Sequence, residues 1–241
     1  MPGAVDLHNH ILHDIDDGPR SIRESLLLCR AMVEAGYDTV AVTPHTCEGR
    51  PAPALIMQRM RELQKEIDRE GLALTLLPGS EQHIEPLTLE RLEKGEIQTL
   101  NNTSYLLLEL PMLQPLPVYT EQLIVNLVSN GYRPIIPHPE RVLVLQNRLD
   151  RLKALHEIGA LFQVTWGALN GILGRQVEQT ARAMVRAGLA HLFASDAHNA
   201  TSRLLTIEKA AAELVKINGP GSDEEMLVTR PRRVIEGLEI S

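Results

Sequence analysis

Short apolar segments alternate with helical patterns along this 241-residue chain, and the alternation constrains the fold more than any other feature. Seven of these segments are predicted strands, at residues 5–10, 39–42, 72–77, 105–108, 133–136, 161–165 and 192–194. Strands separated by helices form parallel sheets with right-handed crossovers. No glycine-rich phosphate-binding turn follows the first segment, which argues against an open dinucleotide-binding sheet. The pattern therefore predicts an α/β fold.

The ends of these strands carry polar side chains. Six of the seven finish with a histidine, an aspartate or a glutamate. In a closed barrel of parallel strands the carboxyl ends meet at one mouth, where barrel enzymes place their catalytic residues. An open sheet could not bring the first and last strands together. We therefore expect a closed barrel whose mouth carries the functional site.

The first strand shows the pattern most clearly. Val5 and Leu7 alternate with His8 and His10, so one face is apolar and the other presents two imidazoles. Two neutral imidazoles on one face suit a divalent metal ion. A half-buried strand with two solvated histidines is an equal alternative on this motif alone. The other strand ends decide between the two readings.

Nine side chains at or near the strand ends are candidate metal ligands. They are five histidines and four carboxylates: His8, His10, Asp17, His45, Glu81, Glu109, His138, Asp196 and His198. Each of them alone could be a helix cap, an ion-pair partner or a solvated loop residue. One metal takes four to six ligands, so two or three ions fit the set better than one. Imidazole and carboxylate ligation without thiolate favours manganese, iron or zinc over magnesium alone.

Composition excludes several classes of protein. The hydrophobic content of 44% supports a large core, and the net charge of −7 argues against binding to a nucleic-acid backbone. No apolar run approaches ~20 residues and no charged-then-apolar leader opens the chain, so we expect a cytoplasmic protein without direct membrane insertion. Attachment to a membrane-bound partner stays open, as does the oligomeric state. No linker divides the chain, and we expect a single domain over residues 1–241.

Several motifs in the chain resemble those of a known family. They are His8-Asn9-His10, Asp16-Asp17-Gly18-Pro19, Pro44-His45, Gly79-Ser80-Glu81, Glu109, His138-Pro139-Glu140-Arg141 and Ser195-Asp196-Ala197-His198. Together they match the PHP (polymerase and histidinol phosphatase) superfamily. More narrowly, the sequence looks like the CpsB-type manganese-dependent protein tyrosine phosphatases of bacterial capsule and exopolysaccharide systems. The resemblance covers nearly the whole chain.

The resemblance implies a distorted seven-stranded (β/α) barrel that holds a three-metal cluster, with manganese ahead of iron or zinc. Carried over by position, the first metal is held by His8, His10, Glu81 and Asp196, the second by Glu81, Glu109 and His138, and the third by Asp17, His45 and His198. Arg141 and Arg203 match the family's phosphate-binding arginines. Asp196 and His198 lie two residues apart, so we expect them to share a strand face.

The function implied is hydrolysis of phosphotyrosine in protein by metal-activated water. The implied substrate is the tyrosine-rich tail of a capsule-assembly tyrosine kinase. A histidinol-phosphate phosphatase of the same superfamily, an amidohydrolase-type barrel and an inactive metal-binding PHP subunit remain alternatives. No residue is marked as the general acid. The histidines at 13, 83, 156 and 191 are expected to be structural or supporting, with His83 in or beside a helix.

Overall fold

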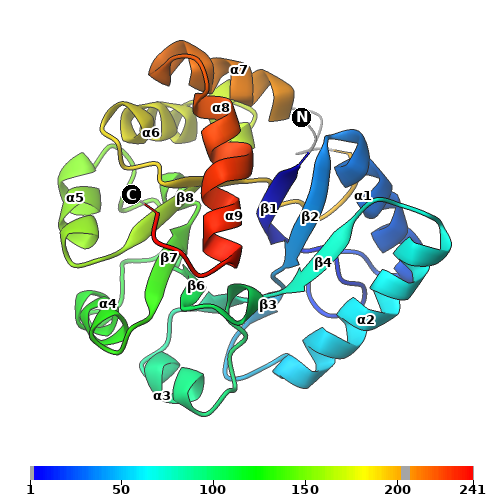
Figure 1. The fold of residues 1–241 in the computed structure, drawn as a ribbon. Helices are drawn as coiled ribbons and strands as arrows, with labels where there is room; N and C mark the ends of the chain where they lie inside the picture. The colour runs from blue at the N-terminus through cyan, green and yellow to red at the C-terminus, as the bar shows by residue number, and fades with distance from the viewer. Residues whose placement is uncertain (1–2, 202–206, 241) are drawn as a thin grey trace.

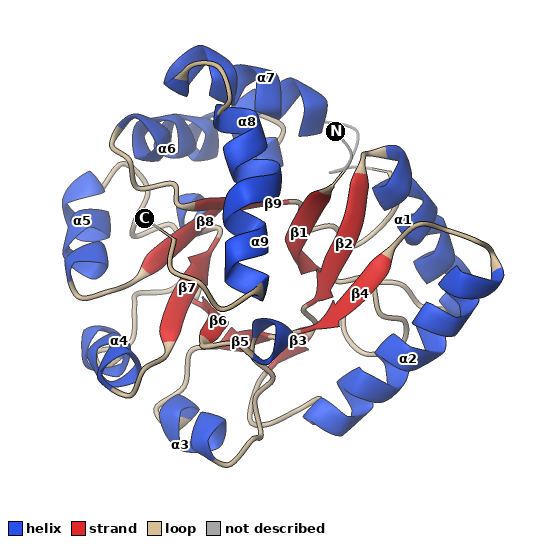
Figure 2. Ribbon diagram, in the orientation of Figure 1, coloured by secondary structure: helices blue, strands red, loops and turns tan. Residues whose placement is uncertain are grey.

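The structure, a computed structural model, describes residues 3–201 and 207–240. Its strands form the centre of the molecule and its helices surround them (Figure 1; Figure 2). The strands are β1 (Ala4–Asn9), β2 (Tyr37–Val42), β3 (His45–Thr46), β4 (Thr75–Pro78), β5 (Glu81–His83), β6 (Tyr105–Glu109), β7 (Arg133–Pro137), β8 (Leu161–Thr165) and β9 (Leu192–Ala194). All of their pairings are parallel. The predicted α/β fold is confirmed.

Two sheets share these strands, in the orders β1-β2-β4 and β3-β5-β6-β7-β8-β9. The sheets separate because two strand positions are interrupted, at Thr43-Pro44 between β2 and β3 and at Gly79-Ser80 between β4 and β5. A Cβ on Gly79 would lie 3.1 Å from the Thr43 side chain, so the two interruptions pack against each other. Counted with these breaks, the chain has the seven strand positions predicted from the sequence.

The ring of strands meets between β1 and β9. The contact is one isolated parallel bridge, from Asn9 to Ala197. Two backbone hydrogen bonds support it: His10 N donates to Ala197 O at 3.0 Å, and Asp196 N donates to His8 O at 3.0 Å. These bonds bring the first and last strand ends together, as the polar residues at both ends require.

The helices of the outer layer follow the strands in turn. They are α1 (Ile22–Glu34), α2 (Pro53–Arg69), α3 (Thr88–Glu93), α4 (Thr120–Ser129), α5 (Leu149–Glu157), α6 (Arg175–Arg186) and α7 (Ile207–Asn218). Helix α1 begins where its sequence predicts, because Ser21 Oγ accepts a hydrogen bond from Glu24 N at 3.3 Å. Glu24 Oε2 in turn accepts from Arg20 N at 2.8 Å. Within the described ranges, no helix combines the length and apolar character needed to cross a membrane.

The C-terminal tail is helical, whereas its sequence, with Gly219-Pro220-Gly221 and Arg230-Pro231-Arg232, predicts a loop and a terminal packing segment. Helix α8 (Ser222–Glu224), a π-helical turn (Glu225–Thr229) and α9 (Arg230–Ile235) follow one another. Pro231 lies in the first turn of α9, directly after the π-helical turn.

Helix α9 runs across one end of the strands in Figure 1 and closes the interior of the barrel. Val234 is fully buried there. It belongs to a small inner cluster with Val5, Leu7, Leu107 and Leu192, whereas a larger cluster fills the space between the strands and the outer helices. Arg232 Nη2 donates to Gly3 O at 2.9 Å, which attaches α9 to the start of β1. The interior of the barrel is therefore packed with side chains at this end.

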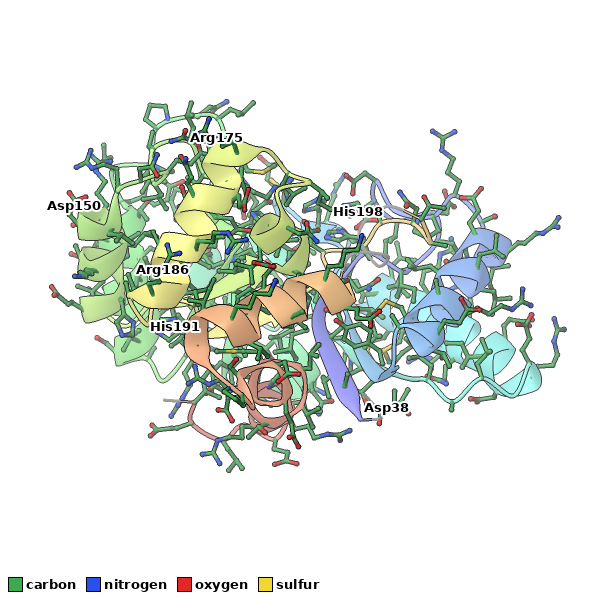
Figure 3. The ribbon with its side chains drawn as sticks, turned by 90° about the horizontal axis from the view of Figure 1, so that it is seen from above. Asp38, Asp150, Arg175, Arg186, His191 and His198 are labelled. Carbon is green, nitrogen blue, oxygen red and sulfur yellow. The ribbon has the colours of Figure 1, made fainter. Side chains whose placement is uncertain are left out.

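Figure 3 shows the two ends of the barrel from the side. Asp38, near the amino end of β2, lies low in this view on the side of the C-terminal helices, and His198, beyond β9, lies high. Arg232 of α9 contacts Asp38 at 3.2 Å. The polar strand ends thus face away from α9, on the side where α/β barrels place their chemistry.

Candidate metal centre

Glu81, the first residue of β5, lies at the centre of the polar cluster. It is fully buried. Three histidine nitrogens approach its Oε2: His8 Nε2 at 3.2 Å, His10 Nε2 at 3.3 Å and His45 Nδ1 at 2.9 Å. Its other oxygen, Oε1, accepts from His138 Nε2 at 2.9 Å. One carboxylate therefore meets four imidazoles that come from three strand ends, because His8 and His10 both belong to the end of β1.

The geometry of these contacts fits a metal site better than it fits a hydrogen-bond network. Among the described residues, Glu81 Oε2 has no hydrogen-bond partner despite its burial. The Nε2 atoms of His8 and His10 face each other at 3.1 Å. Buried polar atoms in proteins are almost always paired, and an exception needs an explanation. Donor atoms that converge on one point without pairing are explained by a cation between them.

The electrostatics of Glu81 agree with that reading. Burial acts to raise the pKa of Glu81, but the nearby His8 charge and the contacts with His10 and His138 hold that pKa well below the ordinary value. The carboxylate is therefore ionised, which is the form that binds a metal.

A second group of donors lies beside the first. It consists of His10, Asp17, His45 and His198, whose ligand atoms all lie within 4.8 Å of one another. Asp17 Oδ1 is 3.2 Å from His198 Nε2 and 3.6 Å from His45 Nε2. The rings of His10 and His198 stack with centroids 4.0 Å apart. Three of these residues are the ones that the family resemblance assigns to a third metal.

His45 also belongs to a further group with Glu81 and Glu109. Its Nδ1 lies 3.6 Å from Glu109 Oε2. The resemblance instead assigns His138 to a metal shared with Glu81 and Glu109. In the structure His138 reaches Glu81 through Oε1, on the other side of the carboxylate from His45. His45 thus belongs to two of the groups of donors.

Asp196 and Arg141 complete the arrangement. Asp196 Oδ1 lies 3.6 Å from Nε2 of both His8 and His10. Its Oδ2 accepts from Arg141 Nη1 at 2.6 Å. The prediction that Asp196 and His198 share a strand face is wrong: β9 ends at Ala194, and Asp196 has a left-handed backbone with φ of 51°. The loop, rather than strand alternation, brings both side chains to the cluster. The predicted phosphate ligand Arg203 lies outside the described residues.

Two supporting residues were missed from the sequence. Asp16 Oδ2 accepts from His10 Nδ1 at 2.7 Å and from the backbone N of His45 at 3.2 Å. Gln163 Oε1 accepts from His8 Nδ1 at 3.2 Å. Such contacts orient the ring so that the opposite nitrogen is available to a metal. The sequence alone could have indicated Gln163. It is a polar residue between the apolar Phe162 and Val164, so it points to the opposite face of the strand.

His83 differs from its expected place. It lies on β5 rather than in or beside a helix. Its side chain is 43% exposed, and its Nδ1 is 3.7 Å from Glu109 Oε2. His191 and His156 do have structural surroundings: their rings lie 4.5 Å apart, and His191 Nδ1 accepts from Phe162 N at 3.0 Å. His13 lies beside Glu62 of α2, at 3.8 Å.

His45 borders two hollows at the mouth of the barrel. One has a volume of about 510 Å³ and is lined by residues 45–47, His83, Glu109 and residues 111–114. The other has a volume of about 670 Å³ and is lined by residues 15–17, His45, residues 50–52 and Leu55. The cluster is therefore open to ligands on two sides.

The chain is similar to known proteins over nearly its whole length. The family described as "Capsular polysaccharide synthesis, CpsB/CapC" matches residues 4–236. Tyrosine-protein phosphatase YwqE of Bacillus subtilis (strain 168) is 37% identical over 214 residues, which cover 88% of this chain and 84% of YwqE. Tyrosine-protein phosphatase CpsB of Streptococcus pneumoniae is 31% identical over 242 residues, which cover 96% and 98%.

Solved structures show the same relationship. A structure from the work on YwqE and CpsB, described as "unique metal-dependent tyrosine phosphatases", superposes with a TM-score of 0.93 at 34% identity and covers 98% of this chain and 96% of its own. An organophosphorus hydrolase from Deinococcus radiodurans has a TM-score of 0.61 at 14% identity, with 97% and 93% covered. This second likeness concerns the fold alone.

Proposed function

This chain belongs to the CpsB/CapC family of capsular polysaccharide synthesis, and from that premise we propose that it is a metal-dependent protein tyrosine phosphatase. The observation that carries the proposal is the approach of four imidazoles to one buried carboxylate, Glu81. A site of this kind binds divalent cations, and divalent cations are the usual means of phosphate-ester hydrolysis without a protein nucleophile. The chain is accordingly a phosphoric monoester hydrolase.

The donors present fit a site with more than one ion. Five imidazoles and four carboxylates exceed what one ion can take, and the set holds no thiolate. We infer two or three ions, with manganese ahead of iron or zinc. The residues proposed to hold them are His8, His10, Glu81 and Asp196 for the first, Glu81, Glu109 and His138 for the second, and Asp17, His45 and His198 for the third. Bound ions would polarise the phosphate oxygens and lower the pKa of water toward neutrality.

The protein's own side chains bind and orient the phosphate. Arg141 lies against the cluster through its 2.6 Å hydrogen bond to Asp196 Oδ2. A guanidinium has five N–H donors in a planar fork, so Arg141 retains donors for phosphate oxygens after that bond. These donors would stabilise the charge that develops on the equatorial oxygens. Arg203 is proposed as a second phosphate ligand on the basis of the family resemblance. Neither cysteine belongs to the cluster.

The proposed substrate is phosphotyrosine in a protein. From the family resemblance we expect the tyrosine-rich tail of a capsule-assembly tyrosine kinase, with the reaction taking place in the cytoplasm. A tyrosine phenolate leaves with a pKa of about 10, far below that of an alkoxide. It therefore depends less on a general acid, and no side chain in the cluster is marked for that role.

The test compares four substrates under one metal condition. Protein purified without chelator and supplied with manganese should hydrolyse a phosphotyrosine peptide and an aryl phosphate faster than a phosphoserine peptide and histidinol phosphate. The expected difference in kcat/KM is at least about tenfold, or roughly 1.4 kcal/mol. Histidinol phosphate as the fastest substrate would assign the chain to small-molecule phosphatases instead.

Elemental analysis of the same preparation separates the metal centre from the choice of substrate. More than one equivalent of manganese, iron or zinc is expected. The variant Glu81→Gln should lose metal and activity together, because it removes the carboxylate shared by two of the three donor groups. Active protein with a metal content near zero would refute the metal centre.

A further inference from the structure

The hollow of about 510 Å³ beside Glu109 has two chemically different walls. One wall is polar and belongs to the cluster, since it contains His45 and Glu109. The other is formed by the loop that follows β6 and carries Pro111, Met112 and Leu113. Its volume lies in the range of about 300–1,000 Å³ that small-molecule sites occupy. The hollow therefore continues the metal centre outward along an apolar surface.

Leu113 is the most informative residue of that wall. Its side chain is 81% exposed, so it contributes almost nothing to the core. A single exposed leucine is ordinary on a protein surface. This one, however, borders a hollow that is also lined by two candidate metal ligands, His45 and Glu109. An apolar side chain beside a site for a charged phosphate matches a substrate that is charged at one end and apolar next to it.

The loop that carries Leu113 is held in place. It contains Pro111, Pro115 and Pro117, each of which restricts the backbone to a narrow range of φ. Met112 O accepts from Leu143 N at 2.8 Å. Leu143 follows Arg141 by two residues, so this bond ties the apolar wall to the segment that carries the phosphate-binding arginine. A wall held in advance costs little ordering entropy when a ligand binds.

We propose that Met112 and Leu113 form the subsite for the aromatic ring of the substrate tyrosine. The inference rests on the proposed function, because it takes the phosphate to lie on the metal centre. With the phosphate there, the ester oxygen points out of the cluster, and the hollow bordered by Glu109 is continuous with it. The ring gains apolar contact with the wall, and a phosphoserine side chain has no group to make that contact. The subsite thus selects aryl over alkyl phosphates.

The second hollow beside His45 is also lined in part by apolar side chains, Ile15, Pro51, Ala52 and Leu55. Asp16 and Asp17 contribute charge to its lining, as does Arg50. Its leucine, Leu55 of α2, is only 37% exposed. The first hollow is preferred for the ring because its wall is bound to the segment of Arg141, through the hydrogen bond from Leu143 N to Met112 O, and because Leu113 is more exposed to a ligand than Leu55. The two hollows can be told apart experimentally, because each has its own leucine.

The test uses two peptides of one sequence that differ only in phosphotyrosine or phosphoserine, with manganese-loaded protein. Leu113→Ser should lower kcat/KM for the phosphotyrosine peptide about tenfold and change that for the phosphoserine peptide less than about twofold. Val118→Ser is the matched control. It makes a comparable change in the same loop, at a fully exposed side chain outside the lining of the hollow, and should leave both values unchanged.

Two results would overturn the subsite. One is an unchanged ratio of the two kcat/KM values in Leu113→Ser, whether both values stay the same or both fall equally, and the other is a change of the ratio in Leu55→Ser instead. Each of these requires that the unaltered protein hydrolyse the phosphotyrosine peptide, so each leaves the proposed function standing. Unaltered protein that fails to hydrolyse this peptide in the presence of manganese refutes the proposed function, and the subsite with it.

Discussion

Arg141 shows how one side chain can serve the cluster and the substrate together. Its Nη1 donates to Asp196 Oδ2 at 2.6 Å, and 22% of its side chain remains exposed at the mouth. The bond fixes the guanidinium plane, which is what a phosphate ligand needs in order to act without reorganisation. It also stabilises a carboxylate that faces His8 and His10.

Replacing Arg141 should therefore affect catalysis more than metal binding. We expect Arg141→Ala to keep its metal content and to lose roughly 2–4 kcal/mol of transition-state stabilisation, which is about 30–1,000-fold in kcat/KM. Elemental analysis and steady-state kinetics on a phosphotyrosine peptide measure the two effects separately. Full activity in Arg141→Ala would exclude the arginine as a phosphate ligand. Loss of metal in that variant would make it a support of Asp196 instead.

At the scale of elements, α9 covers the packed interior of the barrel at one end. The inner cluster is small, and Val234 supplies its cover at the amino ends of the strands. Arg232 secures the helix to Asp38 and to the backbone of Gly3. A side chain at the centre of such a cluster leaves a cavity when it is shortened, because close-packed surroundings relax only in part.

Val234→Ala should lower the free energy of unfolding by about 1–3 kcal/mol. Leu238→Ala is the control, since that side chain is 45% exposed and its loss should cost less than about 0.5 kcal/mol. Urea unfolding followed by circular dichroism gives both values. Activity of the folded Val234→Ala variant should stay unchanged, because α9 lies at the opposite end from the metal centre. Equal stability of the two variants would show that α9 does not cover a filled interior.

The folding stability of the whole molecule should depend on pH through His191, a residue far from the metal centre. His191 lies just before β9, and Figure 3 shows it well away from His198. Burial, together with the charges of His156 and Arg230, lowers the pKa of His191 to about 4. Its neutral Nδ1 accepts a hydrogen bond from Phe162 N. Protonation would remove that acceptor and place a charge in the packed end of the barrel.

This depressed pKa makes folding stability depend on pH. In the unfolded chain His191 titrates near its ordinary value of 6.5, so the unfolded state binds more protons than the folded one between that value and about 4. The stability is complete above about pH 6.5 and falls as the pH drops toward 4. Over this range the contribution of His191 should amount to about 1–3 kcal/mol.

Urea unfolding of the unaltered protein and of His191→Gln at pH 7 and pH 5 measures this contribution. Glutamine keeps an acceptor but does not titrate, and loss of metal in acid affects both proteins alike. The unaltered protein should therefore lose more stability than the variant. An equal loss would mean that His191 is not the group responsible.

Much of this protein could be predicted from local sequence patterns. Residues that alternate along a strand must face opposite sides of it, so Val5 and Leu7 against His8 and His10 already indicate an apolar face and a polar one. Ser21 placed the start of α1 because its hydroxyl satisfies a free backbone N–H. The strand ends contain nine candidate ligands. In the structure each of the nine lies within 4 Å of at least one other candidate.

Other features depend on contacts between distant parts of the chain, and no local pattern encodes them. The sequence around Pro231 predicts a terminal packing segment, yet burial of Val234 and the bond from Arg232 to Gly3 hold a helix there. Asp196 and His198 converge through a loop with a left-handed residue, not through strand alternation. The place of His45 in two donor groups follows from the packing of Gly79 against Thr43, 36 positions apart in the sequence. Periodicity predicts the direction in which a side chain points. Which donor atoms come together depends on how the strands close into a ring and pack, and that packing involves contacts along the whole chain.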